Sequence, residues 1–140
     1  MSDHPSLTTE SLHRLMPFAQ TLGIELIVAA PAEVRCRLPW QQRLEGAGVG
    51  LHGGASMGLA DAAGGICAAL NLPDGATGTT TIESKTNFLR AIRSGTIEAI
   101  SRPLHTGRSV IVIETDLMDH ESRLAARVTQ SQIVLRAAAA

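Results

Sequence analysis

One carboxylate in an otherwise apolar stretch is the residue best placed to do chemistry. Asp61 lies in the run 51–71, where almost every other residue is small or apolar. Because the apolar residues leave no wide polar stripe, the run predicts an enclosed helix over about residues 53–71. An unpaired carboxylate is costly to bury, so an enclosed Asp61 either bonds a neighbouring element or serves as a general base or nucleophile.

The start of the same helix offers a second chemical group. His52-Gly53-Gly54 precedes the apolar run, and the free amides and positive dipole end of a helix N-terminus can hold an oxygen that becomes negative during acyl transfer. Asp61 follows Gly53 by eight residues, which is roughly 12 Å along a helix. That gap is too long for both groups to serve one carbonyl within one chain. A shared site therefore predicts an obligate homodimer, in which Asp61 comes from the other copy of an antiparallel helix pair.

The flanking sequence predicts one α+β domain, spanning residues 1–140, that positions this helix. A capping signal at Thr8 or Thr9 predicts an N-terminal helix over about 8–21 that bends or ends at Pro17. Strands are predicted over 24–28, 33–38, 77–89, 96–102, 109–117 and 124–135, with a loop over 39–50 and a turn over 103–107. A long apolar helix among consecutive antiparallel strands favours a curved sheet wrapped around that helix.

Composition argues against several classes of partner. The net charge is −1 and aromatic residues make up 2% of the chain, which leaves neither a basic stripe nor stacking platforms for nucleic acid. No apolar run is long enough to span a bilayer, and the polar N-terminus is unlike a secretory leader, so we expect a cytoplasmic protein without a membrane partner.

Two further patterns could suggest cofactors, and neither has the required context. Cys36 and Cys67 lack a ligand-like spacing, so we expect reduced, buried thiols and no metal site. The glycines at 48, 50 and 53 match a dinucleotide fingerprint formally, but they follow a polar loop instead of an apolar strand, which argues against a nucleotide site. We expect no cofactor.

With these residues in view, the sequence resembles the hotdog-fold acyl-CoA thioesterases, the superfamily of 4-hydroxybenzoyl-CoA thioesterase, and within it the phenylacetate-pathway type. The resemblance runs from about residue 23 to 135. It is carried by Leu51-His52-Gly53-Gly54, by Asp61, by the segments 79–83 and 103–108, and by the closing strand after Arg123-Leu124.

The resemblance implies roles for several residues. The Gly53 amide would polarise the thioester carbonyl, the partner's helix acid, Asp61, would act as general base or nucleophile, and Thr81 would position water. His52 would orient the oxyanion loop, beside Gly54. Coenzyme A, present only as part of the substrate, would lie along the subunit groove near basic residues, for which Arg90, Arg93, Arg102 and Arg108 are the candidates.

One position departs from the family pattern. Relatives often carry Asn or Gln six residues before the motif His, where this chain has Gly46. Neighbouring Glu45, or a water molecule, would then take over the contact with the acyl carbonyl or the attacking water. The resemblance also implies a dimer of dimers, that is, a homotetramer.

The sequence leaves three functions open. The first is hydrolysis of an aryl- or medium-chain acyl-CoA, for which small residues such as Ala60 and Gly64 leave room beside the helix. The second is an acyl-CoA-binding protein that retains the fold without catalysis, which the absent amide at Gly46 favours. The third is a hotdog hydratase or dehydratase, which would need a His–acid pair that the central helix does not supply.

Overall fold

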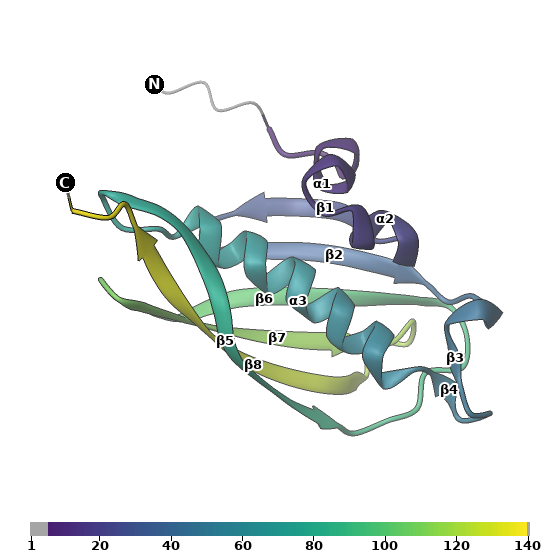
Figure 1. Cartoon of the computed structure of the whole chain (residues 1–140). Helices are drawn as coiled ribbons and strands as arrows, with labels where there is room; N and C mark the ends of the chain where they lie inside the picture. The colour runs from purple at the N-terminus through teal and green to yellow at the C-terminus, as the bar shows by residue number, and fades with distance from the viewer. Residues whose placement is uncertain (1–5, 140) are drawn as a thin grey trace.

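The computed structural model describes residues 6–139, and its main feature is a curved sheet that wraps around one long helix (Figure 1). The helices are α1 (Thr9–Leu15), α2 (Pro17–Leu22) and α3 (Gly53–Leu70), with a 3-10 turn at Gln42–Leu44. The strands are β1 (Glu25–Ala30), β2 (Glu33–Pro39), β3 (Glu45–Gly46), β4 (Gly50–Leu51), β5 (Ala76–Phe88), β6 (Thr96–Thr106), β7 (Val110–Met118) and β8 (Leu124–Arg136).

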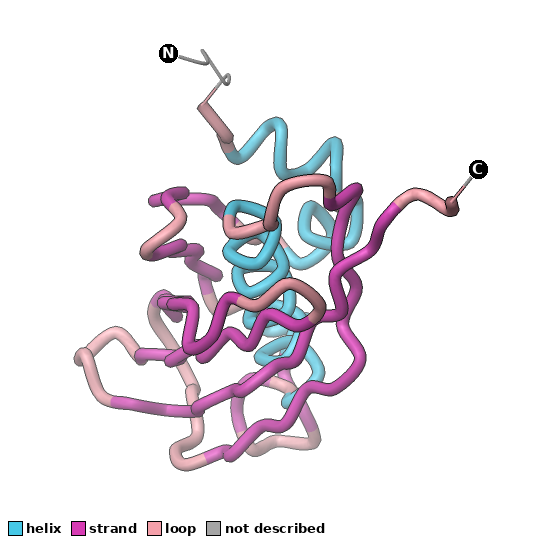
Figure 2. The backbone as a smooth tube through the Cα atoms, turned by 90° about the vertical axis from the view of Figure 1, so that its left-hand side faces the viewer, coloured by secondary structure: helices cyan, strands magenta, loops and turns pink. Residues whose placement is uncertain are grey.

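Six of the strands form one antiparallel sheet in the order β1-β2-β6-β7-β8-β5, while β3 and β4 pair in a separate ribbon. The sheet surrounds α3 on one side when viewed end-on (Figure 2). This is the α+β arrangement that the alternation of strand and helix signals predicts.

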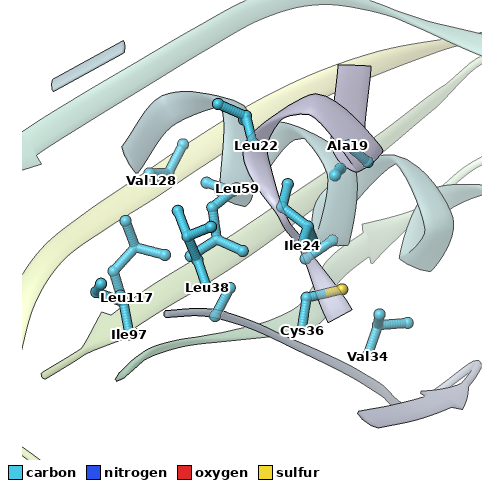
Figure 3. Close-up of a cluster of buried hydrophobic side chains, with 14 of the residues drawn as sticks. Ala19, Leu22, Ile24, Val34, Cys36, Leu38, Leu59, Ile97, Leu117 and Val128 are labelled. Atoms are coloured by element: carbon cyan, nitrogen blue, oxygen red, sulfur yellow. The ribbon is translucent and has the colours of Figure 1, made fainter. Parts of the chain in front are cut away.

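The core lies between α3 and the concave face of the sheet. On β2 the side chains of Val34, Cys36 and Leu38 are fully buried, whereas the residues between them are not, so the predicted alternation is confirmed. These three pack in a cluster with Leu59 of α3 and Ile97 of β6 (Figure 3).

The N-terminal helical signal resolves into two short helices. Thr8 caps α1 by accepting a hydrogen bond from the Ser11 amide, and Pro17 occupies the first turn of α2, where its missing N–H is not needed. The chain then turns at Gly23, whose φ of 86° is the left-handed conformation typical of a helix C-terminus. Helix α1 contacts β1 and helix α2 contacts α3 (Figure 1).

The predicted turn over 103–107 is wrong. Strand β6 continues through Pro103 to Thr106 and pairs with β7, with a register shift between Pro103 and His105. A bulge lets a sheet accommodate a proline that cannot donate to the ladder. The reversal follows at Gly107, whose amide donates to the Val110 carbonyl.

Strand β5 forms one edge of the sheet. It pairs only with β8 among the described strands, and it is 13 residues long with just Glu83 and Lys85 as charges. The Ile82 side chain is 60% exposed and that of Phe88 55% exposed. Natural proteins usually shorten or charge such an edge, since an open edge invites pairing with another chain.

Within residues 6–139, no helix is both long enough and apolar enough to pass through a membrane.

Candidate active site

The N-terminus of α3 leaves one backbone amide free. His52 is the N-cap residue, and its Nδ1 accepts a hydrogen bond of 2.8 Å from the Gly54 amide. The His52 carbonyl accepts from the amides of Ala55 and Ser56. Among the described residues no acceptor takes the Gly53 N–H. The His52 side chain therefore orients the first turn, and Gly53 is the donor that remains for a ligand.

A cavity of about 410 Å³ opens beside this amide. Its walls include Gly53, Phe88 and Arg90. The Phe88 ring lies over Gly53: a Cβ at that position would be 3.2 Å from Phe88 Cζ. The free amide thus faces an apolar, concave space with a guanidinium on its lining, which suits a long ligand that has an anionic end.

Asp61 lies on the solvent-exposed side of α3, so the expectation of an enclosed carboxylate is wrong for the single chain. Between the two ends of α3, the residues that are exposed or half-buried recur at helical spacing, and they are Gly54, Met57, Gly58, Asp61, Gly65 and Ala69. The stripe that they form is apolar or small except at Asp61. The prediction of no wide polar stripe therefore holds, but one narrow face of the helix is left uncovered.

Asp61 is held from one side by the sheet. Its Oδ1 accepts from Thr81 Oγ1 at 3.4 Å and from Gln130 Nε2 at 3.3 Å. Thr81 Oγ1 accepts in turn from Gln132 Nε2 at 2.7 Å, and Gln132 Oε1 accepts from Thr79 at 3.2 Å. Both hydrogen bonds to the carboxylate fall on Oδ1, and Oδ2 has no partner among the described residues.

A small recess of about 150 Å³ adjoins the other side of the carboxylate. It is lined by Met16, Phe18, Ala19, Ile24, Gly58, Asp61 and Ala62. Gly53 does not line this recess, and Asp61 does not line the cavity beside Gly53. One chain therefore places the amide and the carboxylate in separate spaces, as the helix spacing predicts.

The remaining predicted substrate contacts divide into two groups. Glu45 and His52 share a small surface depression near the helix start, and a Cβ at Gly46 would lie 3.3 Å from His52 Cα. Arg108 lies far from Gly53, because its carbonyl accepts from Arg136, which also reaches the Asp74 carbonyl beyond the C-terminal end of α3. Within one chain it cannot serve the same ligand as Arg90.

The two other arginine candidates, Arg93 and Arg102, lie in different places. Arg93 approaches Gly50, whose φ is 103° and whose Cβ, if present, would lie 2.5 Å from the Ile92 carbonyl oxygen. Only glycine fits there, so the loop beside the cavity depends on it. Arg102 pairs with Glu33 at 2.7 Å, and it does not line the cavity beside Gly53.

The segment that carries these site residues matches a known protein family. Residues 50–126 match the family model described as the thioesterase superfamily. The chain belongs to the thioesterase superfamily. The match begins at β4, just before α3, and includes Gly53, Asp61 and Thr81. It confirms the resemblance from the sequence and the prediction of a thioester hydrolase.

Individual relatives of this thioesterase-superfamily chain are named as an esterase, a thioesterase and an acyl-CoA hydrolase. The chain is 34% identical to ComA2 of Bacillus subtilis over 106 residues, covering 75% of this chain and 83% of ComA2. The crystal structure of a thioesterase from Haemophilus influenzae superposes with a TM-score of 0.84 at 27% identity, covering 94% of this chain and 92% of that one. The 1,4-dihydroxy-2-naphthoyl-CoA hydrolase of Escherichia coli is 32% identical over 74 residues, covering 53% of this chain and 54% of the hydrolase.

Three residues of this thioesterase site are not predicted from the sequence. Phe88 reads there as an ordinary strand residue, yet it covers the free amide. Gln130 and Gln132 are each 1% exposed, on the same face of β8 as the buried Val128. The available signal was the alternation itself, since two glutamines occupy the apolar phase of a strand.

The two cysteines line none of the cavities described above. Cys36 and Cys67 are free and buried, as predicted, and burial raises the pKa of the Cys36 thiol to about 12 and that of Cys67 to about 11. Between residues 6 and 139, no three His, Cys, Asp or Glu side chains gather as a metal ion would require.

Proposed function

We propose that the protein hydrolyses acyl-CoA thioesters in sites formed across a homodimer, each combining Gly53 of one subunit with Asp61 of the other. The observation that carries the proposal is that the free amide and the carboxylate line different cavities of one chain. Each half-site has one of the two groups that acyl transfer needs, and both lie at the surface, where a second copy can reach them.

Two uncovered surfaces support a dimer. The exposed residues of α3, among them Met57, Asp61 and Ala69, leave part of the helix open to a second helix, and an antiparallel copy would bring its Asp61 toward Gly53. The open edge of β5 can pair with the same edge of a partner and extend the sheet. A closed isologous dimer of this kind covers both surfaces at once. The dimer of dimers that the resemblance implies would be a further level of assembly.

The chemistry follows from the groups present. Asp61 Oδ2 accepts a proton from water, and the water oxygen bonds to the thioester carbonyl carbon. The Gly53 N–H and the helix dipole stabilise the negative oxygen that forms. The C–S bond then breaks, the electron pair leaves with sulfur, and the thiolate takes up a proton. A thiolate leaves readily, so one carboxylate and one amide donor suffice. Thr81 helps hold the carboxylate and water in place.

Direct attack by Asp61 on the carbonyl is the alternative route. It would give a mixed anhydride that water then hydrolyses. The two routes differ in the fate of an oxygen atom: oxygen-18 from labelled water enters Asp61 in a single turnover only if the anhydride forms.

The cavities favour a compact acyl group. The recess beside Asp61 has a volume of about 150 Å³ and Phe18 and Met16 on its walls, which fits one aromatic ring or a medium chain. The larger cavity beside Gly53, with Arg90 in its lining, suits the pantetheine arm and the phosphates of coenzyme A. The name of the Escherichia coli relative also points to an aryl-CoA. The buried thiols fit a reducing cytoplasm.

Two observations disfavour the hydratase alternative: no histidine of the same chain lines the recess at Asp61, and His52, which a second copy would bring beside Gly53, already accepts the Gly54 amide through Nδ1. The non-catalytic binder is an outcome of the test.

Mixed dimers test the shared site. Gly53→Pro and Asp61→Asn chains carry different tags, are co-expressed and are assayed for thiol release from benzoyl-CoA. Each variant alone should be inactive. A one-to-one mixture should recover about a quarter of wild-type activity, because half of the dimers are mixed and each has one intact site of two.

The result separates the alternatives. If each site lay within one chain, every site in the mixture would carry a defect and no activity would return. Acyl-CoA binding without release by the wild type would show a binding protein. Sedimentation of each variant as the wild-type assembly is the control for folding.

A further inference from the structure

Gln130 is a buried side chain that a simple core would not contain. It is 1% exposed and stands on the inner face of β8, in line with Val128. Its Oε1 is buried without a hydrogen-bond partner among the described residues. An unpaired buried carbonyl destabilises a fold, so Gln130 lowers the stability of the protein at this position.

The central helix is shaped to admit this side chain. A Cβ at Gly64 would lie 1.9 Å from Gln130 Oε1, so any other residue at that position would collide with the amide. Gly64 is buried within α3, where glycine is less favourable than alanine. Two locally unfavourable choices, on different elements, therefore accommodate one another.

The other end of the amide explains the arrangement. Gln130 Nε2 donates to Asp61 Oδ1 at 3.3 Å and lies 3.4 Å from Thr81 Oγ1. Asp61 is one turn before Gly64 on the same side of α3, so an amide lying along the helix at Gly64 reaches the carboxylate. The opposite orientation of the amide would turn its oxygen toward the carboxylate, which is repulsive.

We propose that Gln130 is a positioning residue for Asp61. It anchors Oδ1 from inside the sheet, so that the unpartnered Oδ2 keeps one direction toward the thioester or its attacking water. This inference depends on the proposed function, because it assumes that Asp61 performs the chemistry. Gln130 itself is too deeply buried to touch substrate, and it acts through the carboxylate.

The test replaces the amide by an apolar side chain of similar length. Gln130→Met should lower kcat for benzoyl-CoA by about 10- to 100-fold, since the carboxylate loses its anchor, while KM changes less than about 2-fold. The thermal unfolding midpoint should stay equal or rise, because the variant removes an unpaired buried carbonyl. A side chain with only a packing role would instead lower the midpoint and leave kcat alone.

A double-mutant cycle locates the effect. If Gln130 acts through Asp61, Gln130→Met should have no effect on the residual rate of an Asp61→Asn chain. Gln132→Met is the matched comparison, because Gln132 contacts Thr81 and not Asp61; its kcat should fall less. Unchanged kcat in Gln130→Met, or an equal loss in both backgrounds, would overturn the proposal.

A second variant covers the case in which Gln130→Met does not fold. Gly64→Ala displaces the amide by overlap without changing its chemistry, and it gains helix propensity. It should lower kcat in the same direction, and a wild-type kcat would refute the positioning role. Failure of the underlying function is distinguishable: an active Asp61→Asn variant removes the chemistry from Asp61, whereas an inactive one beside a fully active Gln130→Met rejects only the inference.

Discussion

The oxyanion role of Gly53 can be tested by replacing its backbone N–H with the N–Cδ bond of proline. Gly53 is the first residue of α3, where proline fits a helix and where its missing N–H interrupts no helical bond. The preceding residue, His52, has φ −60° and ψ 135°, which is the conformation that proline favours in its predecessor. Gly53→Pro therefore deletes the donor with the helix start preserved.

The structure sets the expected size of the effect. The new Cβ would lie 3.2 Å from Phe88 Cζ, and Phe88 is more than half exposed, so the ring can move aside. Loss of one oxyanion donor typically lowers kcat by about 100- to 1,000-fold, or about 2.7 to 4 kcal/mol. Thiol release from benzoyl-CoA at saturating substrate should fall by that factor.

Gly53→Ala is the matched control. It brings the same Cβ and the same contact with Phe88 but retains the N–H, so its kcat should stay within about 10-fold of the wild type. The reasoning is refuted if the two variants fold alike and have equal kcat values. In that case the Gly53 amide does not stabilise the thioester oxyanion, and the cavity beside it would only bind the substrate.

Two predictions remain. If the 150 Å³ recess holds the acyl group, kcat/KM for benzoyl-CoA and hexanoyl-CoA should exceed that for palmitoyl-CoA at least about 10-fold; a preference for palmitoyl-CoA in a thiol-release panel would place the acyl group elsewhere. Burial raises the pKa of Cys36 and Cys67 above the ordinary 9.0, so the unfolded chain loses these thiol protons first as the pH rises. The contribution of the two thiols to the free energy of unfolding should therefore be fully present below pH 9 and decline above it. Urea titrations at pH 7 to 10.5 measure this decline, and a Cys36→Ala chain with an identical decline would contradict it.

The architecture was predictable because its signals are local. Strand alternation in β2, the capping residue before α1 and the apolar run of α3 each follow from a few neighbouring residues. The end of β6 was not predictable, because Pro103 reads as a turn and only its pairing with β7, across a bulge, keeps it in the sheet. Non-local pairing overrides local propensity there.

The candidate site was predictable in part for the same reason. The spacing of Gly53 and Asp61 lies within one helix, and so does the inference that one chain separates them. The support of Asp61 depends on Gln130, which is 69 residues away along the chain. Only the register of β8 against β5 brings that amide under the helix, and sequence spacing does not contain a register.

The exposure of Asp61 explains why one chain can hold Gly53 and Asp61 apart and still form an active site. An isolated chain leaves the carboxylate in water, where a general base is well solvated and gains little from its neighbours. Covering the stripe of α3 by a second subunit would shield Asp61 Oδ2 from bulk solvent, leave room for the attacking water, and place Oδ2 near the free Gly53 amide. The Oδ1 side is already paired with Thr81 and Gln130 in the single chain, so association would change only the surroundings of the reactive oxygen. Assembly and the completion of the catalytic site would then be the same event, and a stable but inactive monomer is the state that this arrangement predicts for a variant unable to associate.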